Sequence, residues 1–204
     1  MADQAAFWDK IAERYAARPV DHPEAYAATL DRARAHLDAE ARVLEVGCGT
    51  GSTAIALAPS VAAYRATDIS VRMVEIARAK PEAQALGHLT FAVEPAGAPN
   101  GPFDAILAFN LIHLLPDPAA GLRRMAAQLR PGGRLISKTP CLGDLSLFLR
   151  VAVPAMQWMG KAPAVKFLTA RGLDRAAQAA GFDILETDVL PKAFAQRLLI
   201  ARRP

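Results

Sequence analysis

The segment VLEVGCGTGSTAIALAP, residues 43–59, decides the fold of this 204-residue chain. An apolar run leads into a glycine-rich turn, and a stretch of small residues with helical character follows. Glycine allows backbone conformations that other residues rarely adopt, and it lets a ligand approach the backbone closely. We therefore expect a strand, a turn and a helix here, with a ligand bound at the turn.

The chain on either side alternates between strand-like and helix-like segments. Strands are expected at 42–46, 63–67, 89–93, 103–109 and 133–138, mostly separated by helical stretches near 52–58, 70–79 and 118–130. Such alternation predicts an α/β fold with a doubly wound, mainly parallel sheet. The link between the third and fourth strands is rich in proline and glycine and predicts a loop.

The two ends of the chain are organised differently. A helical section over 7–37 is interrupted at Pro19 and Pro23. After the fifth strand come an apolar insertion and a helix near 169–180. Two strands then follow within 182–190 and 196–203, joined by a short loop around Pro191 and Lys192. Because they are consecutive and closely linked, we expect them to pair antiparallel.

Length and composition predict a single globular domain over residues 1–204, with an N-terminal helical cap over 1–38 and a lid-like insertion over 140–168. The apolar fraction is 52% and the charged fraction 22%, which excludes a disordered chain. A net charge of +4 without a dense basic patch gives no indication of nucleic-acid binding. Monomer and homodimer remain open.

Targeting and metal-binding signals are absent from the sequence. Cys48 and Cys141 form neither a disulfide framework nor a zinc spacing, so we expect a cytoplasmic protein without a metal. The N-terminus lacks the pattern of a signal peptide. The apolar segment 145–159 is too short to span a bilayer and contains Arg150 and Pro154, so no transmembrane segment is expected.

The glycine turn excludes two kinds of phosphate site. A dinucleotide fingerprint would need glycine at position 52, which is Ser52, and no Gly-Lys-Ser/Thr follows as in a P-loop. Glu45, at the end of the strand, would repel a pyrophosphate but suits a cationic ligand. Asp68 ends the next strand, where a carboxylate can accept hydrogen bonds from both ribose hydroxyls. S-adenosylmethionine, a nucleoside with a positive group and no phosphate, fits this description.

Four motifs carry a resemblance to a known family: VLEVGCGTG (43–51), ATDISVRMVEIAR (66–78), PFDAILAFNLIHLLPD (102–117) and LRPGGRLISKTP (129–140). In this order and spacing they resemble the class I S-adenosylmethionine-dependent methyltransferases, in the group with a methyltransferase-11/25-like core. The resemblance implies a Rossmann-like seven-stranded sheet in the order 3-2-1-4-5-7-6. Its last strand is antiparallel, and helices cover both faces.

The resemblance also implies a set of cofactor-binding residues. Glu45 and the glycines would hold the methionyl part, Asp68 the ribose, and Ile69 and Met73 the adenine. The full set is Tyr15, Glu45, Gly47, Cys48, Gly49, Gly51, Asp68, Ile69, Ser70, Met73, Glu94, Pro95, Ala96, Asn110 and Leu111. Many relatives carry an acid for the adenine amino group where this chain has Pro95. Either Glu94 replaces it, or the backbone of Pro95 and Ala96 reads the adenine edge.

Candidates for the acceptor side are fewer. His113 follows the donor-end loop and is the candidate catalytic acid or base. Packing against its apolar neighbours is the alternative, and a substrate-orienting or a structural role is open for Lys138 and Cys141. The insertion, with Phe148, Met156, Trp158 and Met159, suggests a lid over an apolar molecule, with ordinary helix packing as the alternative. Peripheral membrane contact through Arg150, Lys161 and Lys166 is weaker, because no basic amphipathic face emerges.

Two functions follow from these residues. The first is an enzyme that transfers a methyl group from S-adenosylmethionine to a small, apolar or amphipathic acceptor and releases S-adenosylhomocysteine. The alternative is a non-methylating protein that binds either compound and has a repurposed acceptor site. Methyl transfer needs alignment and exclusion of water more than acid-base chemistry, so the lack of an evident base is compatible with the first.

Overall fold

In the computed structural model, one seven-stranded sheet has the order β3-β2-β1-β4-β5-β7-β6. The structure describes residues 2–98, 101–145, 147–159, 162–189 and 196–204. The strands are β1 (Arg42–Val46), β2 (Ala63–Asp68), β3 (Leu89–Val93), β4 (Phe103–Phe109), β5 (Leu129–Pro140), β6 (Asp183–Val189) and β7 (Gln196–Arg202). β7 is antiparallel to β5 and to β6, and the other pairs are parallel. The predicted sheet order and the antiparallel last strand are confirmed.

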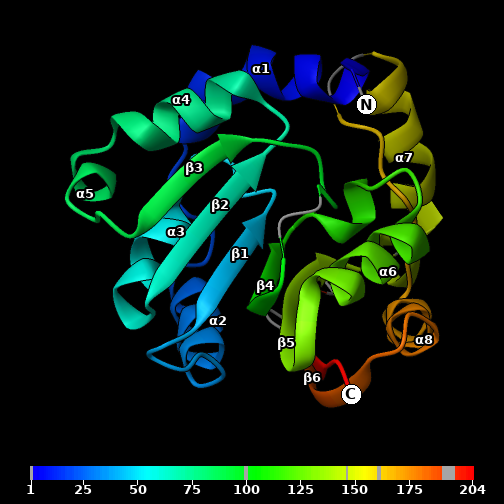
Figure 1. Cartoon of the computed structure of the whole chain (residues 1–204). Helices are drawn as coiled ribbons and strands as arrows, with labels where there is room; N and C mark the ends of the chain where they lie inside the picture. The colour runs from blue at the N-terminus through cyan, green and yellow to red at the C-terminus, as the bar shows by residue number, and fades with distance from the viewer. Residues whose placement is uncertain (1, 99–100, 146, 160–161, 190–195) are drawn as a thin grey trace.

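Helices cover both faces of the sheet (Figure 1). They are α1 (Ala2–Ala16), α2 (Pro23–Arg34), α3 (Ser52–Leu57), α4 (Val71–Ala79), α5 (Pro81–Gln84), α6 (Pro118–Gln128), α7 (Leu147–Trp158) and α8 (Ala170–Ala179). Among the described residues, no helix is long and apolar enough to cross a membrane. The insertion carries α7, and the helix predicted near 169–180 is α8, with Thr169 as its N-cap.

Side-chain alternation along the strands divides the core into two layers. Val43 and Leu107 point to one face, where they pack with residues of α2, α3 and α4. Leu44 and Ile106 point to the other face and pack with residues of α6 and α8. Successive side chains of a strand point to opposite faces, and central strands buried on both sides are therefore apolar throughout. This explains why most residues of β1 and β4 are apolar.

The fifth strand is longer than the 133–138 predicted from sequence. β5 begins at Leu129, which pairs with Phe103, and includes the Pro-Gly-Gly segment. Gly132 donates a backbone hydrogen bond of 2.8 Å to Arg203, and Arg203 returns one of 2.8 Å to Gly133. The backbone of Arg203 thus extends the sheet along Gly132 and Gly133, although the Pro-Gly-Gly segment by itself favours a turn. The loop predicted around Pro191 and Lys192 lies outside the described residues.

Candidate active site

Three adjoining cavities lie at the carboxyl ends of the parallel strands. We name them the Glu94, Glu45 and Lys138 cavities, with volumes of about 450, 140 and 310 Å³. The first two share Gly47, Asp68, Leu111 and Leu114, and the last two share Tyr15, Cys48, Thr53 and Asn110. The shared walls make them parts of one cleft, at the position where open α/β sheets bind ligands.

The glycine turn after β1 forms the floor of this cleft. Gly47 has a positive φ of 71°, and a Cβ atom built on it would lie 2.8 Å from the Leu111 side chain. The backbone N–H groups of Gly47 and Cys48 donate to the Thr67 carbonyl at 2.7 and 3.0 Å, which fastens the turn to β2. A side chain here would be strained by the positive φ and would displace Leu111, so glycine presents the backbone itself to the cleft.

Asp68 stands where the Glu94 and Glu45 cavities meet. Its carboxylate accepts hydrogen bonds from the backbone N–H groups of Gly49 at 2.8 Å and Ser70 at 2.9 Å. Burial raises the pKa of Asp68, while these two N–H donors act in the opposite direction. A carboxylate oxygen accepts more than one hydrogen bond, so the fixed side chain keeps capacity for ligand hydroxyls.

Glu45 lies beneath the cleft and is 2% exposed. The Tyr64 hydroxyl donates a hydrogen bond of 2.9 Å to its carboxylate. Burial raises the pKa of Glu45 to about 8, against the lowering effect of the Tyr64 hydrogen bond. A cation in the Glu45 cavity would favour the ionised form.

Helix α1 lies alongside α4 at the end of the sheet to which β1 and β2 point (Figure 1). Trp8 and Tyr15 line the Glu45 cavity, and Gln4 lines the Glu94 cavity. The Gln4 side-chain amide donates to the Leu114 carbonyl at 2.8 Å. Sequence reasoning missed Gln4 and Trp8 as lining residues, although it included Tyr15 of the same helix.

Asp9 fastens α1 to the start of α4. Its carboxylate accepts hydrogen bonds from the Ser70 hydroxyl at 2.5 Å and from the Arg72 backbone N–H at 3.0 Å. The Ser70 hydroxyl also accepts from the backbone N–H of Met73 at 3.1 Å, so it caps α4. Ser70 therefore joins helix α1 of the N-terminal cap to the start of α4, and it does not line any of the three cavities.

Glu94 and Ala96 line the Glu94 cavity together with Ile69, whereas Pro95 is not among its lining residues. The Glu94 carboxylate forms an ion pair with Arg65 on β2, a partner that the sequence did not indicate. The backbone N–H of Glu94 donates to the Asp68 carbonyl at 2.9 Å. Both predicted ways of reading an adenine edge, by Glu94 or by backbone, remain predictions.

The structure brings most of the predicted cofactor residues together. Those lining the Glu94 or Glu45 cavity are Tyr15, Glu45, Gly47, Cys48, Gly49, Asp68, Ile69, Met73, Glu94, Ala96, Asn110 and Leu111. Gly51 lies outside them, because its backbone packs against Phe91 and Ala77. Arg124 of α6 lines the Glu94 cavity and was not anticipated. Among the described residues, no group of His, Cys, Asp and Glu could hold a metal ion.

His113 lies beside the cleft without lining any of the three cavities. Its side chain is 8% exposed, and Nδ1 has no hydrogen-bond partner in the described part of the chain. Burial lowers the pKa of His113 to about 4, so the ring is neutral near pH 7. The catalytic role of His113 stays a prediction, and its burial is what the packing alternative expects.

The insertion contributes no lining residue to the three cavities in its described part. Trp158 on α7 is 91% exposed, and Met156 and Met159 are also exposed. The Lys166 backbone N–H donates to the His113 carbonyl at 2.7 Å, which fastens the insertion to the segment after β4. The side chains of Phe148 and Arg150 and the whole of Lys161 lie outside the described residues.

Lys138 and Cys141, at the end of β5, have different surroundings. Lys138 lines the third cavity, and its ammonium donates to the Thr29 hydroxyl at 3.0 Å. Cys141 is fully buried, and burial raises the pKa of its thiol to about 11. Of the two, only Lys138 faces the cleft.

Comparison with known proteins agrees with this geometry. A family described as "Methyltransferase domain" matches residues 17–187. A protein of Xanthomonas oryzae pv. oryzae (strain PXO99A), named ubiquinone biosynthesis O-methyltransferase, is 35% identical over 114 residues. That match covers 54% of this chain and 48% of the relative. The chain spans about half the length of the curated relatives it matches.

Solved structures share the fold. Magnesium protoporphyrin IX methyltransferase from Synechocystis PCC 6803, with bound SAH, superposes with a TM-score of 0.72 and 21% identity, covering 98% of this chain and 95% of that one. The cyclase SpnF superposes with a TM-score of 0.70 and 21% identity, covering 87% of this chain and 81% of that one. At these identities the likeness concerns the fold alone.

Proposed function

We propose, since this chain belongs to the class I S-adenosylmethionine-dependent methyltransferases, that it transfers a methyl group from this cofactor to a small, apolar or amphipathic acceptor. The observation that carries the proposal is the pair of carboxylates on one cleft. Asp68, at the end of β2, lines the Glu94 and Glu45 cavities, and Glu45 lies beneath the turn after β1. The sequence between Glu45 and Asp68 contains neither the dinucleotide fingerprint nor a P-loop, which favours a cationic nucleoside over a dinucleotide as the ligand.

The cleft residues fit each part of the cofactor. In our assignment the ribose hydroxyls bind Asp68, and the cationic methionyl end lies over Glu45 and Gly47. The adenine lies in the Glu94 cavity, whose volume of about 450 Å³ and largely apolar walls suit a planar base. The open backbone at Gly47 supports this placement, because a side chain there would collide with Leu111.

When bound, the cofactor supplies a sulfonium methyl group that is already activated for displacement. The chain then has to align the acceptor, exclude water and hold the cofactor still. We assign the covering role to the N-terminal cap over 1–38, whose Tyr15 and Trp8 line the cleft. The insertion over 140–168 stays our candidate lid, within a single domain over 1–204.

The acceptor is a small molecule in our proposal. The Xanthomonas relative carries the name of an O-methyltransferase, so hydroxylated aromatic compounds are the first class to test. Cytoplasmic location, a monomeric or homodimeric state and the absence of nucleic-acid partners are further parts of the proposal.

The test is release of S-adenosylhomocysteine from S-adenosylmethionine in the presence of pooled acceptors. Release above the background without acceptor, and its loss in Asp68→Ala, is the expected result. The matched control is Asp104→Asn at the opposite end of the sheet, which should keep the activity. Tight cofactor binding without release on any pool would favour the non-methylating alternative, whose precedent in this fold is a protein named as a cyclase.

A further inference from the structure

Lys138 is a buried cation at the wall of the third cavity. Its side chain is 8% exposed, and none of the ion pairs given by the described residues includes it. A buried ammonium is costly unless it is paired with an anion or donates to several acceptors. Burial accordingly lowers the pKa of Lys138.

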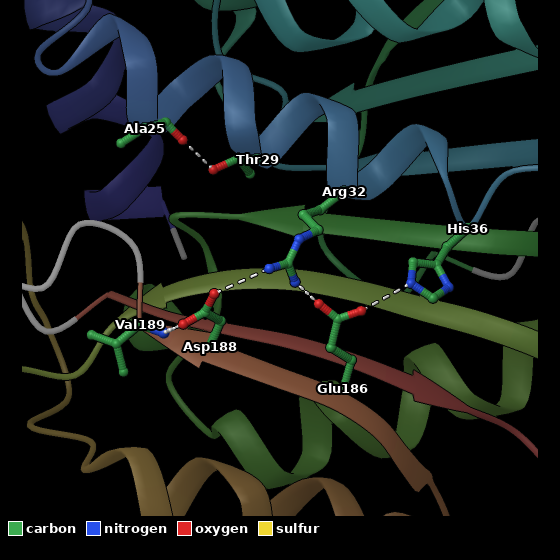
Figure 2. Close-up of polar contacts among 7 residues, drawn as sticks. All are labelled: Ala25, Thr29, Arg32, His36, Glu186, Asp188 and Val189. Carbon is green, nitrogen blue, oxygen red and sulfur yellow. Dashed lines mark hydrogen bonds and ion pairs between the residues drawn. The ribbon is translucent and has the colours of Figure 1, made fainter.

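The Lys138 ammonium has more N–H donors than the one used in its single described hydrogen bond. The Thr29 hydroxyl donates its own proton to the Ala25 carbonyl at 2.7 Å (Figure 2). Toward the Lys138 ammonium, at 3.0 Å, this hydroxyl can therefore only accept. An ammonium has three N–H donors, of which Thr29 takes one. Among the described residues no acceptor takes the other two, and Lys138 lines the cavity wall.

Helix α2, which carries Thr29, is fastened by a cluster of ion pairs. Arg32 forms ion pairs with Glu186 and with Asp188, the latter at 3.3 Å, and the His36 ring lies 3.2 Å from the Glu186 carboxylate (Figure 2). These contacts join α2 to β6 and so hold the helix that carries Thr29, the hydrogen-bond partner of Lys138. A specificity site requires residues that are held by their surroundings in this way.

The remaining charges of the Lys138 cavity nearly cancel. Arg18 and Asp21 both line it and pair with each other at 3.0 Å. Tyr26 and Asn110 add neutral polar groups to the wall. Among the described lining residues, Lys138 is thus the charged group without a partner of opposite sign, and the cavity volume of about 310 Å³ is enough for a small molecule.

The register of the sheet separates this cation from the cationic end of the cofactor. Glu45 is level with Leu107 and Ile136, and Lys138 lies two residues farther along β5. Two strand spacings and two residue rises place the Cα atoms of Glu45 and Lys138 about 12 Å apart. With the cofactor ammonium placed over Glu45, this separation makes Lys138 a site for an anionic group of a second molecule, and the test below distinguishes that group from the cofactor's own carboxylate.

We propose that Lys138 selects the methyl acceptor by pairing with an anionic oxygen, a carboxylate or a phenolate, in the Lys138 cavity. The proposal rests on the function proposed above and adds the charge of the acceptor to it. Acceptors that are apolar elsewhere but carry this group are bound with the anionic end toward β5 and the remainder toward Asn110.

The test compares matched ligands on the protein saturated with S-adenosylhomocysteine. The probes are benzoate against benzamide, 4-hydroxybenzoate against its methyl ester, and octanoate against octanamide, titrated by calorimetry. We expect at least one carboxylate to bind at least tenfold tighter than its neutral partner. Lys138→Met should abolish that preference and Lys138→Arg should keep it. Lys166→Met, which changes an exposed lysine outside the cavity, is the matched control.

Several results would overturn the assignment. They are equal binding of the neutral partners, carboxylate binding that survives Lys138→Met, and no binding of any probe to the wild-type protein. The wild-type comparison needs no variant, so it stands even if Lys138→Met does not fold. A tenfold loss of S-adenosylhomocysteine affinity in Lys138→Met would assign the ammonium to the cofactor carboxylate instead. Failure of the wild-type protein to bind S-adenosylhomocysteine would contradict the proposed function itself.

Discussion

The hydroxyl of Tyr64 lies 2.9 Å from the carboxylate of Glu45, and the two side chains are buried together beneath the cofactor cleft. The pair joins neighbouring strands, since Glu45 is on β1 and Tyr64 on β2. A buried carboxyl group is more stable protonated than ionised, unless a cation approaches it. The free protein therefore carries a neutral Glu45 at pH 7, which a cationic ligand can convert into a carboxylate.

This state of Glu45 predicts a pH dependence of stability. Burial raises its pKa from 4.5 to about 8 in the folded protein. Between those values the folded state holds a proton that the unfolded state has lost, so the free energy of unfolding falls as the pH rises, by up to about 1.4 kcal/mol per pH unit. Urea unfolding at pH 5 and 7.5 measures this fall. Glu45→Gln should show a smaller fall, and equal falls in both proteins would contradict the assignment.

Replacing Asp68 should weaken cofactor binding directly. Asp68→Ala removes the carboxylate that meets both cavities and leaves the Gly49 and Ser70 N–H groups without their acceptor. The loss of hydrogen bonds to a charged group predicts a decrease of about 1.5–3 kcal/mol, or roughly 10–150-fold, in the affinity for S-adenosylhomocysteine. Calorimetry on Asp68→Ala and Asp104→Asn measures it. An unchanged affinity in Asp68→Ala would remove this residue from the ribose site.

The contact of Asp9 with α4 predicts that the cap and cofactor binding are coupled. Asp9→Ala removes the acceptor for the Ser70 hydroxyl and the Arg72 N–H, a loss comparable to that of a helix cap, about 0.5–2 kcal/mol. We expect faster amide hydrogen exchange in α1 and weaker S-adenosylhomocysteine binding. Asp21→Ala, which breaks only an exposed pair with Arg18, is the control. Unchanged exchange in α1 would show that Asp9 does not hold the cap.

His113 allows a direct choice between its two interpretations. The ring is buried and outside the three cavities, so His113→Gln should change the turnover rate by less than about twofold while lowering the melting temperature, as replacement of a buried side chain does. Turnover and S-adenosylhomocysteine affinity are measured on the same preparation. If turnover instead became slower by about two orders of magnitude or more at unchanged affinity, His113 would be restored as the general acid or base.

Much of this architecture could be predicted because its signals are local. The apolar runs at β1 and β4 and the glycine turn determine their own conformation, and the spacing between Glu45 and Asp68 places both at strand ends. Parallel strands bring their carboxyl ends to one edge of the sheet, so Glu45 and Asp68 lie on the same cavity regardless of the conformation of the loops. The expected strand β3, Leu89–Val93, was predicted in the same way.

What escaped prediction depends on segments that meet only in the fold. The Arg65 partner of Glu94, the Gln4 contact to Leu114 and the Thr29 contact to Lys138 join residues 29, 110 and 109 positions apart. Neither hydrophobic periodicity nor motif spacing carries such information, because these pairs are set by how helices pack on the sheet. The lining roles of Gln4 and Trp8 in α1 were missed for the same reason, although Tyr15 of the same helix was predicted.

The cleft is expected to bind S-adenosylmethionine and its product, and not a dinucleotide. This is measured by calorimetric titration of the wild-type protein with S-adenosylhomocysteine, S-adenosylmethionine and NAD. We expect one site per chain for the first two compounds and no detectable heat of binding for NAD. Binding of NAD, with no binding of either S-adenosyl compound, would contradict it.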